Sequence, residues 1–230
     1  MSTVLNRLIE RLPRKDRARL LSLCEPVNLV LGHVLSEPDT LVRHVYFPTG
    51  GFISLVAMIE GTPGVEVGMV GSEGMLGAEL ALGVVTAPLH SLVQGAGAAW
   101  RLDVAVFRRE LARNTALQRA LQRYLYVLSA QLATSAACLR FHLISPRLAR
   151  WLLMTQDRAH SESFRVTQEF LAYMLGVRRV GITVAAGVLQ RNGLIRYRRG
   201  DFTVLDRPGL EAVACSCYAA GRKSYADLLG

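Results

Sequence analysis

Two groups of arginines in the C-terminal part of the chain carry the clearest chemical signal. Arg178 and Arg179 stand at the predicted start of a helix, and Arg196, Arg198 and Arg199 follow in a strand-like run. A planar guanidinium donates two parallel hydrogen bonds to a guanine edge or to a phosphate. Arginines in these two settings are therefore suited to reading a base and to holding a nucleic-acid backbone.

The elements that would position the first pair form a helix–turn–helix pattern. Thr167 is a good helix cap, and Gln168–Leu175 is predicted to form a two-turn helix with its large apolar residues inward. Gly176 permits a tight turn. A second helix is predicted over Arg178–Gln190, and Gly193 ends it. This spacing is typical of two helices that cross closely in DNA-binding proteins.

A basic hairpin follows the second helix. The run from Leu194 to Arg199 and the run Phe202–Leu205 are both strand-like, and Gly200-Asp201 is predicted as the two-residue turn between them. A helix–turn–helix followed by such a hairpin is a winged helix. The wing arginines would lie along phosphates and supply affinity, and the second helix would select the sequence.

The net charge of +9 is concentrated in this part of the chain. Residues 140–230 hold 14 basic and 7 acidic residues, against 13 and 11 in residues 1–139. This asymmetry favours a polyanionic partner, with nucleic acid first. The alternative is a solvated basic face without a partner. No apolar run is long enough for a membrane span or a secretory signal, so we expect a cytoplasmic protein without a membrane partner.

The N-terminal part has a different pattern. Residues 1–24 are predicted to be helical, with Leu5, Leu8, Ile9 and Leu12 on one face. Turn-rich sequence follows, and it predicts a small β-barrel or roll. The expected strands are Val27–Leu31, His44–Phe47, Phe52–Ile59, Val65–Val70, His90–Gln94 and Ala98–Leu102.

The segment Asn114–Phe141 lacks Pro and Gly and predicts one long helix. A heptad pattern along it favours a seam between two copies of the chain. The predicted seam residues are Leu117, Leu121, Tyr124, Leu128, Gln131, Ser135 and Cys138, and Leu125, Leu132 and Leu139 add a second stripe. One stripe could face the β-domain and the other a partner helix; the alternative is a helix packed within a monomer. Ser145-Pro146 is predicted to start the next helix.

Together these features resemble the Crp/Fnr family, the relatives of the cyclic-AMP receptor protein and the fumarate–nitrate regulator. The stretch TQEFLAYMLGVRRVGITVAAGVLQRNGLIRYRRG is similar to the family's helix–turn–helix and first wing strand, and RHVYFPTGGFISLVAMIEG with GMVGSEGMLG is similar to its effector roll. The resemblance implies an α+β fold with a cyclic-nucleotide-binding-like β-roll (1–112), a dimerisation helix (113–142) and a winged helix–turn–helix domain (143–230).

The resemblance also assigns roles to residues of the winged helix. Thr167 and Gln168 match positions that hold phosphate at a helix N-terminus. Arg178, Arg179 and Thr183 fall among the base-reading positions, and Arg179 matches the arginine that reads guanine. The family's usual Glu is Val180 here, and its second base-reading Arg is Val184. The well-known family operator should therefore not be assumed.

The same comparison argues against a cyclic nucleotide as cofactor. Relatives that bind one have an arginine for the cyclic phosphate, whereas no Arg lies between Glu79 and Arg101. Glu79, His90 and Ser91 are the candidate effector-pocket residues. A buried phosphate without a fixed cation would be poorly compensated, so we expect no cofactor.

The four cysteines and five histidines predict neither a metal site nor catalysis. On a helix, Cys215 and Cys217 would point about 200° apart, and no two histidines have helical metal-site spacing. Free structural thiols are expected, with Cys138 or the Cys215/Cys217 pair as redox candidates. No nucleophile elbow or phosphate-binding loop is present, so no catalytic residue is assigned.

These observations predict a regulator that binds double-stranded DNA at an inverted repeat as a homodimer, with a sensory roll of unknown effector. The competing hypothesis is a ligand-sensing or protein-interaction module whose winged helix does not bind DNA. A third, weaker hypothesis is a thiol redox sensor. Activation would need a surface for RNA polymerase, and no residue identifies one. The operator, the effector and the sign of regulation do not follow from the sequence.

Overall fold

The computed structural model describes residues 6–62 and 64–229 of the 230-residue chain. These residues form two compact units. The first comprises the described residues up to Leu55, then Gly68–Ser129, and those from Tyr225 onward; the second comprises Val56–Val67 and Ala130–Ser224. The long helix therefore contributes to both units, whereas the ranges predicted from sequence treat it as a separate part.

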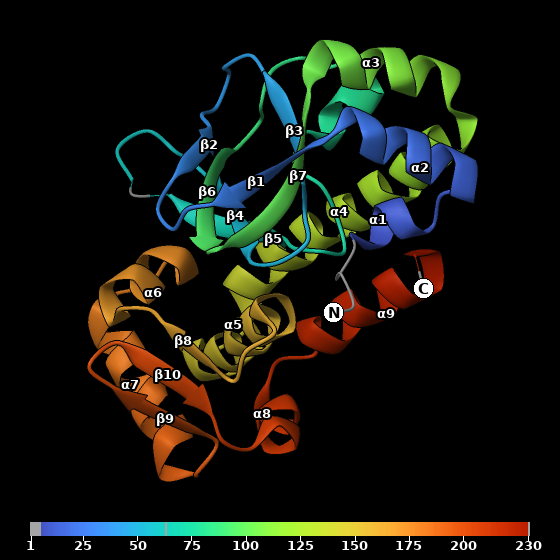
Figure 1. Ribbon diagram of the computed structural model, residues 1–230. Helices are drawn as coiled ribbons and strands as arrows, with labels where there is room; N and C mark the ends of the chain where they lie inside the picture. The colour runs from blue at the N-terminus through green and yellow to red at the C-terminus, as the bar shows by residue number, and fades with distance from the viewer. Residues whose placement is uncertain (1–5, 63, 230) are drawn as a thin grey trace. The chain divides into compact units, whose positions relative to one another are not determined.

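Two sheets build the roll of the first unit (Figure 1). One has the order β1-β7-β3, and the other has the order β2-β6-β4-β5. The strands are β1 (Glu25–Leu29), β2 (Val34–Ser36), β3 (His44–Pro48), β4 (Phe52–Ala57), β5 (Val65–Val70), β6 (His90–Gly95) and β7 (Gly97–Asp103). The six predicted strands are confirmed to within a few residues, and only the three-residue β2 was missed.

Short helices flank the roll. They are α1 (Arg7–Glu10), α2 (Arg14–Leu23), the 3₁₀ helix η1 (Ala78–Leu82) and α3 (Val104–Arg113). The single helix expected over residues 1–24 is wrong, because Pro13 interrupts it as the N-cap of α2. Asn6 caps α1 through its side chain. The predicted inward residue Leu5 lies outside the described residues.

The core of the first unit lies between the β1-β7-β3 sheet and the helices. Phe47, Phe107, Leu121 and Tyr124 are all fully buried in it. The hydroxyl of Tyr124 donates a hydrogen bond of 3.1 Å to the carbonyl of Met75. Glycine is required at position 74, because a Cβ there would lie only 2.4 Å from that hydroxyl. Tyr124 thus joins the long helix to the turn before η1.

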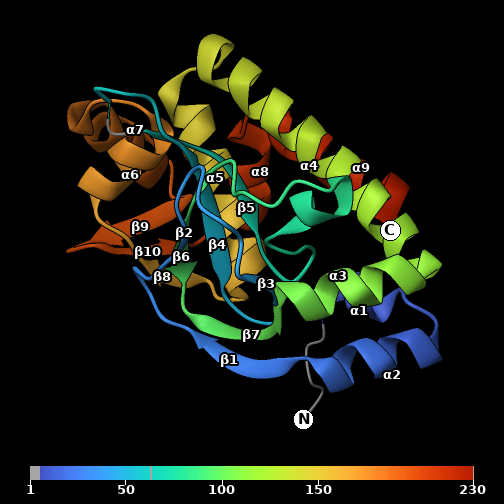
Figure 2. The ribbon, with the colours of Figure 1, turned by 90° about the horizontal axis from the view of Figure 1, so that it is seen from above.

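The long helix α4 spans Thr115–Phe141, as predicted (Figure 2). The residues predicted as its dimer seam do share one face, but that face packs against the chain itself. Leu117, Leu121 and Tyr124 belong to the core of the first unit, and Gln131, Ser135 and Cys138 are also buried. These residues therefore pack within the chain, which is the alternative that the sequence left open: the heptad pattern reveals an apolar stripe, but not what covers it.

The second unit is mainly helical and carries a three-stranded sheet of order β8-β10-β9. Its elements after α4 are α5 (Ile144–Ala159), β8 (Ser163–Arg165), α6 (Gln168–Leu175), α7 (Arg179–Arg191), β9 (Ile195–Arg198), β10 (Asp201–Val204), α8 (Arg207–Val213) and α9 (Cys217–Leu229). Helix α5 begins at Ile144 with Leu143 as its N-cap, so Ser145 is not the cap that the sequence predicts.

In the described part of the chain, no single helix is long and apolar enough to cross a membrane. Helices α6 and α7 meet the length and composition criteria only as a pair, and this pair is bent by 106°.

Tyr124→Phe tests the contribution of the buried hydroxyl. The variant should lower the free energy of unfolding by about 0.5–1.5 kcal/mol, because the Met75 carbonyl loses its hydrogen bond inside the core. Tyr126→Phe is the matched control, since Tyr126 is on the same helix but 66% exposed. Chemical denaturation of both variants checks this, and equal losses would contradict it.

Candidate nucleic-acid interface

Helices α5, α6 and α7 form the apolar support of the interface. Leu148 and Leu152 of α5 are completely buried, as are Leu171 of α6 and Ile182 of α7. Ala185 and Ala186 are small, buried residues on α7. The three-to-four periodicity predicts these buried residues of α7 correctly, whereas Phe170 of α6, also predicted to point inward, is only half-buried. The opposite face of α7 is left to solvent.

The turn between α6 and α7 has the predicted chemistry. The hydroxyl of Thr167 accepts a hydrogen bond of 3.1 Å from the backbone N–H of Phe170, so Thr167 caps α6. Gly176 adopts a left-handed φ of 60°, which favours glycine. The buried guanidinium of Arg147 donates to the Leu175 carbonyl at the end of α6. The orientation of α6 is therefore fixed at both ends.

The candidate base-reading residues lie on the exposed face at the start of α7. The helix begins at Arg179, with Arg178 as its N-cap, one residue later than predicted. Arg178, Arg179 and Thr183 are exposed. The Thr183 hydroxyl donates to Gln168 Oε1 at 2.7 Å. The two residues predicted to contact base and phosphate are thus linked across the two helices.

Two apolar side chains complete this face. Val180 and Val184 are 66% and 62% exposed, although valine is usually buried in a helix of this kind. An exposed valine in a major groove can contact the methyl group of thymine. The family resemblance places both valines at base-reading positions, where they depart from the usual Glu and Arg.

The wing is present, but its turn differs from the prediction. Arg199 and Gly200 have φ values of 53° and 92°, and Asp201 pairs with Arg198 across the hairpin. The turn is therefore Arg199-Gly200 rather than Gly200-Asp201. A two-residue turn with positive φ at both positions matches the twist of the strands. Sequence favours Asp over Arg at such a position, which explains the error of one residue.

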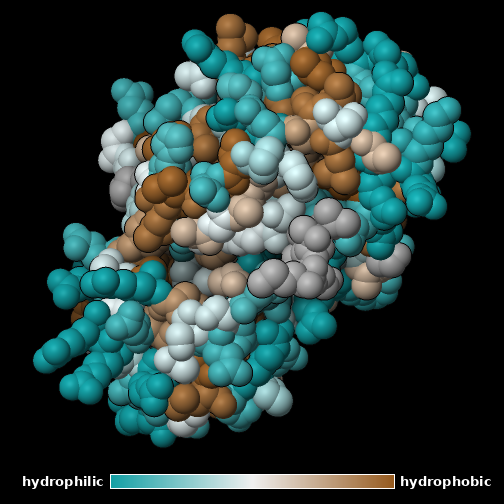
Figure 3. Space-filling view, viewed as in Figure 1, coloured by the Kyte–Doolittle hydropathy of each residue, from teal (hydrophilic) through white to brown (hydrophobic). Residues whose placement is uncertain are grey.

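The hairpin presents its arginines on one face. Arg196 and Arg198 are exposed, whereas Ile195 is buried and Tyr197 is half-buried. Tyr197 lies against Phe202 with ring centroids 4.2 Å apart, and its backbone N–H donates to Gln190 Oε1 at 2.7 Å. Hydrophilic side chains project from the hairpin region in Figure 3. None of the five predicted DNA-contacting arginines forms an ion pair with another described residue.

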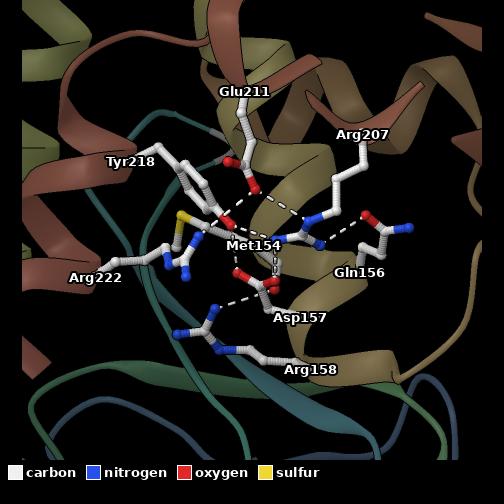
Figure 4. A network of polar contacts seen from close by, with 8 residues as sticks. All are labelled: Met154, Gln156, Asp157, Arg158, Arg207, Glu211, Tyr218 and Arg222. Carbon is white, nitrogen blue, oxygen red and sulfur yellow. Dashed lines mark hydrogen bonds and ion pairs between the residues drawn. The ribbon is translucent and has the colours of Figure 1, made fainter. Parts of the chain in front are cut away.

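A polar network supports the domain behind the interface (Figure 4). Arg207, which opens α8, donates to Gln156 at 2.8 Å, to Asp157 at 2.7 Å and to Glu211 at 3.0 Å. Tyr218 donates to the other oxygen of Asp157 at 2.8 Å. Burial raises the pKa of Tyr218 to about 12, so this hydroxyl stays protonated at neutral pH. The network joins α8 and α9 to α5.

The three candidate effector-pocket residues do not converge. Glu79 lines a cavity of about 540 Å³ with Glu37, Arg43 and His44. His90 and Ser91 are not among the lining residues; His90 Nδ1 pairs with Glu37 Oε2 at 2.7 Å, and Ser91 is buried in β6. Burial raises the pKa of Glu79. Arg43, which the sequence analysis did not single out, brings a cation to the lining from just before β3, outside the stretch between Glu79 and Arg101 that lacks arginine.

The cysteines are arranged in a way that the sequence did not predict. Cys138, Cys215, Cys217 and His142 lie together in the second unit. Cys215 precedes α9 rather than lying on it, so the prediction that its thiol points away from Cys217 is wrong. Hydrogen bonding from Cys215 lowers the pKa of Cys138 to about 4, against the effect of burial. The four-residue spacing from Cys138 to His142 was the available signal.

Comparison with known proteins agrees with this geometry. Residues 146–213 match the family described as a Crp-like helix-turn-helix domain. FixK2 from Bradyrhizobium japonicum is 12% identical, with a TM-score of 0.70 over 84% of this chain and 98% of its own. A Crp/Fnr-family regulator from Eubacterium rectale is 13% identical, with a TM-score of 0.69 over 90% and 96%. No curated protein matches in sequence.

The c-di-GMP-responsive regulator CLP of Xanthomonas campestris is 17% identical, with a TM-score of 0.66 over 84% of this chain and 99% of its own. At these identities the structural likeness establishes the shared fold. The interface is thus a winged helix–turn–helix of the class found in DNA-binding transcriptional regulators. Residues 146–213 thus match a Crp-like helix–turn–helix domain, and the chain shares its fold with solved regulators of the Crp/Fnr family.

Arg179→Ala tests the base-reading assignment. Loss of a bidentate contact to guanine should cost about 1–3 kcal/mol on specific DNA and relax the choice at one base pair. Arg108→Ala, at an exposed position on α3, is the charge-matched control. Binding should be measured by fluorescence anisotropy on specific and random duplexes. Equal weakening on both duplexes would contradict this role for Arg179.

Proposed function

We propose that this protein is a sequence-specific transcriptional regulator that binds an inverted-repeat operator as a homodimer. The observation that carries the proposal is the set of exposed arginines at the start of α7 and along the wing, which lack acidic partners within the described residues. Cations held in fixed positions on a rigid support are suited to a polyanion. The two groups of arginines have different roles: those of α7 select the bases, and those of the wing hold phosphates.

The first turns of α7 define what a half-site should contain. Arg179 would donate to O6 and N7 of a guanine, and Val180 and Val184 would contact thymine methyl groups. Thr167 and Gln168 would hold a phosphate at the start of α6. The proposed half-site therefore combines guanine with flanking thymine and differs from an operator read by Glu and a second Arg.

The dimer would form through a second stripe of α4. Leu125, Ser129, Leu132, Ala136 and Leu139 recur at intervals of four and three, about 100° around the helix from the buried face. All five are half-buried or exposed. The small residues would permit close approach of a second α4, and the leucines would fill the seam. Two copies would then present their α7 helices to successive major grooves, about 34 Å apart.

Ala136→Arg tests this seam. A charge buried between two copies without a partner costs on the order of 3–5 kcal/mol, so the dimer should dissociate at least about 100-fold more readily. Ala112→Arg, at an exposed position on α3, is the control and should remain dimeric. Sedimentation equilibrium measures both. A dimer unaffected by Ala136→Arg would exclude this stripe.

The salt dependence of DNA binding tests the role of the wing. Replacing Arg196, Arg198 and Arg199 with Ala should weaken specific and random DNA alike and flatten the slope of log K against log salt by roughly 0.9 per lost phosphate contact. The control replaces Arg108, Arg109 and Arg113, three exposed arginines of α3, and changes the net charge equally. An unchanged slope in the wing variant would remove the wing from the interface and favour a protein-docking role.

We also propose that the roll does not bind a cyclic nucleotide. The cavity of the roll is lined by two carboxyl groups, Glu37 and Glu79, which would oppose a cyclic phosphate. Arg43 lies on the same lining but is exposed rather than buried behind a phosphate site. We therefore expect the effector to be another small molecule, or DNA binding to need none.

Addition of cyclic AMP should leave the thermal unfolding midpoint unchanged. A ligand present at 100 times its Kd would add about 2.7 kcal/mol of stability and shift the midpoint visibly. Differential scanning fluorimetry with a nucleotide-free control measures this. A concentration-dependent rise in the midpoint would contradict the exclusion.

A further inference from the structure

Three cysteines and one histidine form a compact cluster in the second unit, and none of the proposed DNA interface residues belongs to it. Cys138 lies in the last turn of α4 and His142 directly follows this helix, whereas Cys215 precedes α9 and Cys217 is its first residue. One donor atom from each residue lies within 4.8 Å of the other three. The three cysteines are buried and His142 is half-buried.

The spacing of the donor atoms matches the edges of a metal-centred tetrahedron. With Zn–S near 2.3 Å and Zn–N near 2.05 Å, a tetrahedral site places two sulfurs about 3.8 Å apart and a sulfur and a nitrogen about 3.6 Å apart. The Cys138 and Cys215 sulfurs are 3.6 Å apart, and Cys217 Sγ lies 3.5 Å from His142 Nδ1. Both pairs therefore stand at ligand-to-ligand distances around one ion.

The surrounding charge suits such a site. Three thiolates and a divalent cation leave a net charge of −1, which needs a nearby positive group when buried. Arg150 acts electrostatically on all three cysteines, and its Nε is buried without a hydrogen bond among the described residues. Its Nη2 donates to Ser135 at 3.1 Å, one turn before Cys138 on α4. Arg147, also buried, interacts with Cys138 and Cys215.

We propose that Cys138, His142, Cys215 and Cys217 bind one thiophilic divalent metal ion, with zinc as the natural choice, in a closed tetrahedral site. Three sulfurs and one imidazole nitrogen are the donor set of structural zinc sites. A disulfide between Cys138 and Cys215 would leave Cys217 and His142 without a role, whereas a metal ion uses all four.

The site would fasten the end of α4 to the start of α9. The segment from Ala214 to Ser216 lies outside helices, and α9 begins only at Cys217. An ion bound there supplies folding free energy through its ligands. Metal binding would therefore determine how well ordered the segment from Ala214 to Ser216 is. This segment lies in the second unit, next to the end of the proposed dimer helix α4.

The first test is the metal content of the untagged, full-length protein, purified under reducing conditions. We expect inductively coupled plasma mass spectrometry to find about one zinc ion per chain. After removal of zinc, titration with Co²⁺ should saturate at one ion per chain and give a thiolate-to-cobalt charge-transfer band with the intense visible bands of a tetrahedral site. Reduced, folded protein that binds neither ion stoichiometrically would overturn the proposal.

Substitutions distinguish this site from adventitious binding. Cys138→Ser, Cys215→Ser and Cys217→Ser should each weaken metal binding by more than the 10–100-fold that the loss of an outer-shell partner typically costs. Cys24→Ser is the matched control, because Cys24 is the fourth cysteine and lies outside the cluster. Equal binding by Cys24→Ser and Cys138→Ser would contradict the assignment.

Alkylation of the native wild-type protein gives a measurement that does not depend on the folding of variants. Added Zn²⁺ should protect Cys138, Cys215 and Cys217 from modification and leave Cys24 unaffected, as read by peptide mass spectrometry. Identical labelling with and without metal, or a Cys138–Cys215 disulfide in freshly reduced and desalted protein, would overturn the metal site.

Discussion

The structure depends on how the apolar surface of α4 is distributed. One continuous helix of 27 residues contributes to both compact units, and its buried stripe is a core element in each. That stripe is held by Tyr124, whose ring and hydroxyl fill the space that Gly74 leaves open. With this face committed to the core, the stripe through Leu132 and Ala136 is the one that we propose for a second copy. A long helix with two apolar stripes needs two partners, and here the first partner is its own chain.

In the proposed interface, helix α7 likewise has one buried face and one exposed face. Buried residues such as Ile182 and Leu171 fix α7 against α6, so the exposed side of α7 is presented on a rigid support. The hydrogen bond from Thr183 to Gln168 holds the two helices in register at that surface. Among the described residues, no acidic side chain forms an ion pair with the arginines of this interface. Charge left unpaired on a rigid element is the physical basis for attraction to phosphate.

Local sequence rules predicted most of this fold because the relevant interactions are local. The cap at Thr167, the glycine at 176 and the helical periodicity each act within a few residues. Prediction failed where the outcome depended on distant partners. The sequence revealed the apolar stripe on α4, but not which residues pack against it. Cys138 and Cys215 are 77 positions apart, so only the tertiary structure brings them together. The wing turn was misplaced because Arg199 adopts a backbone conformation that its residue type seldom favours.

The most direct test of the central claim is selection from a random pool of DNA duplexes by the purified, ligand-free dimer, followed by sequencing of the duplexes that survive competitor DNA. A sequence-specific dimer should enrich a two-fold symmetric motif with a guanine in each half-site and half-sites one helical turn apart. Failure to enrich any motif, both with the purified dimer and after addition of cell extract to supply an effector, would contradict a sequence-specific regulator.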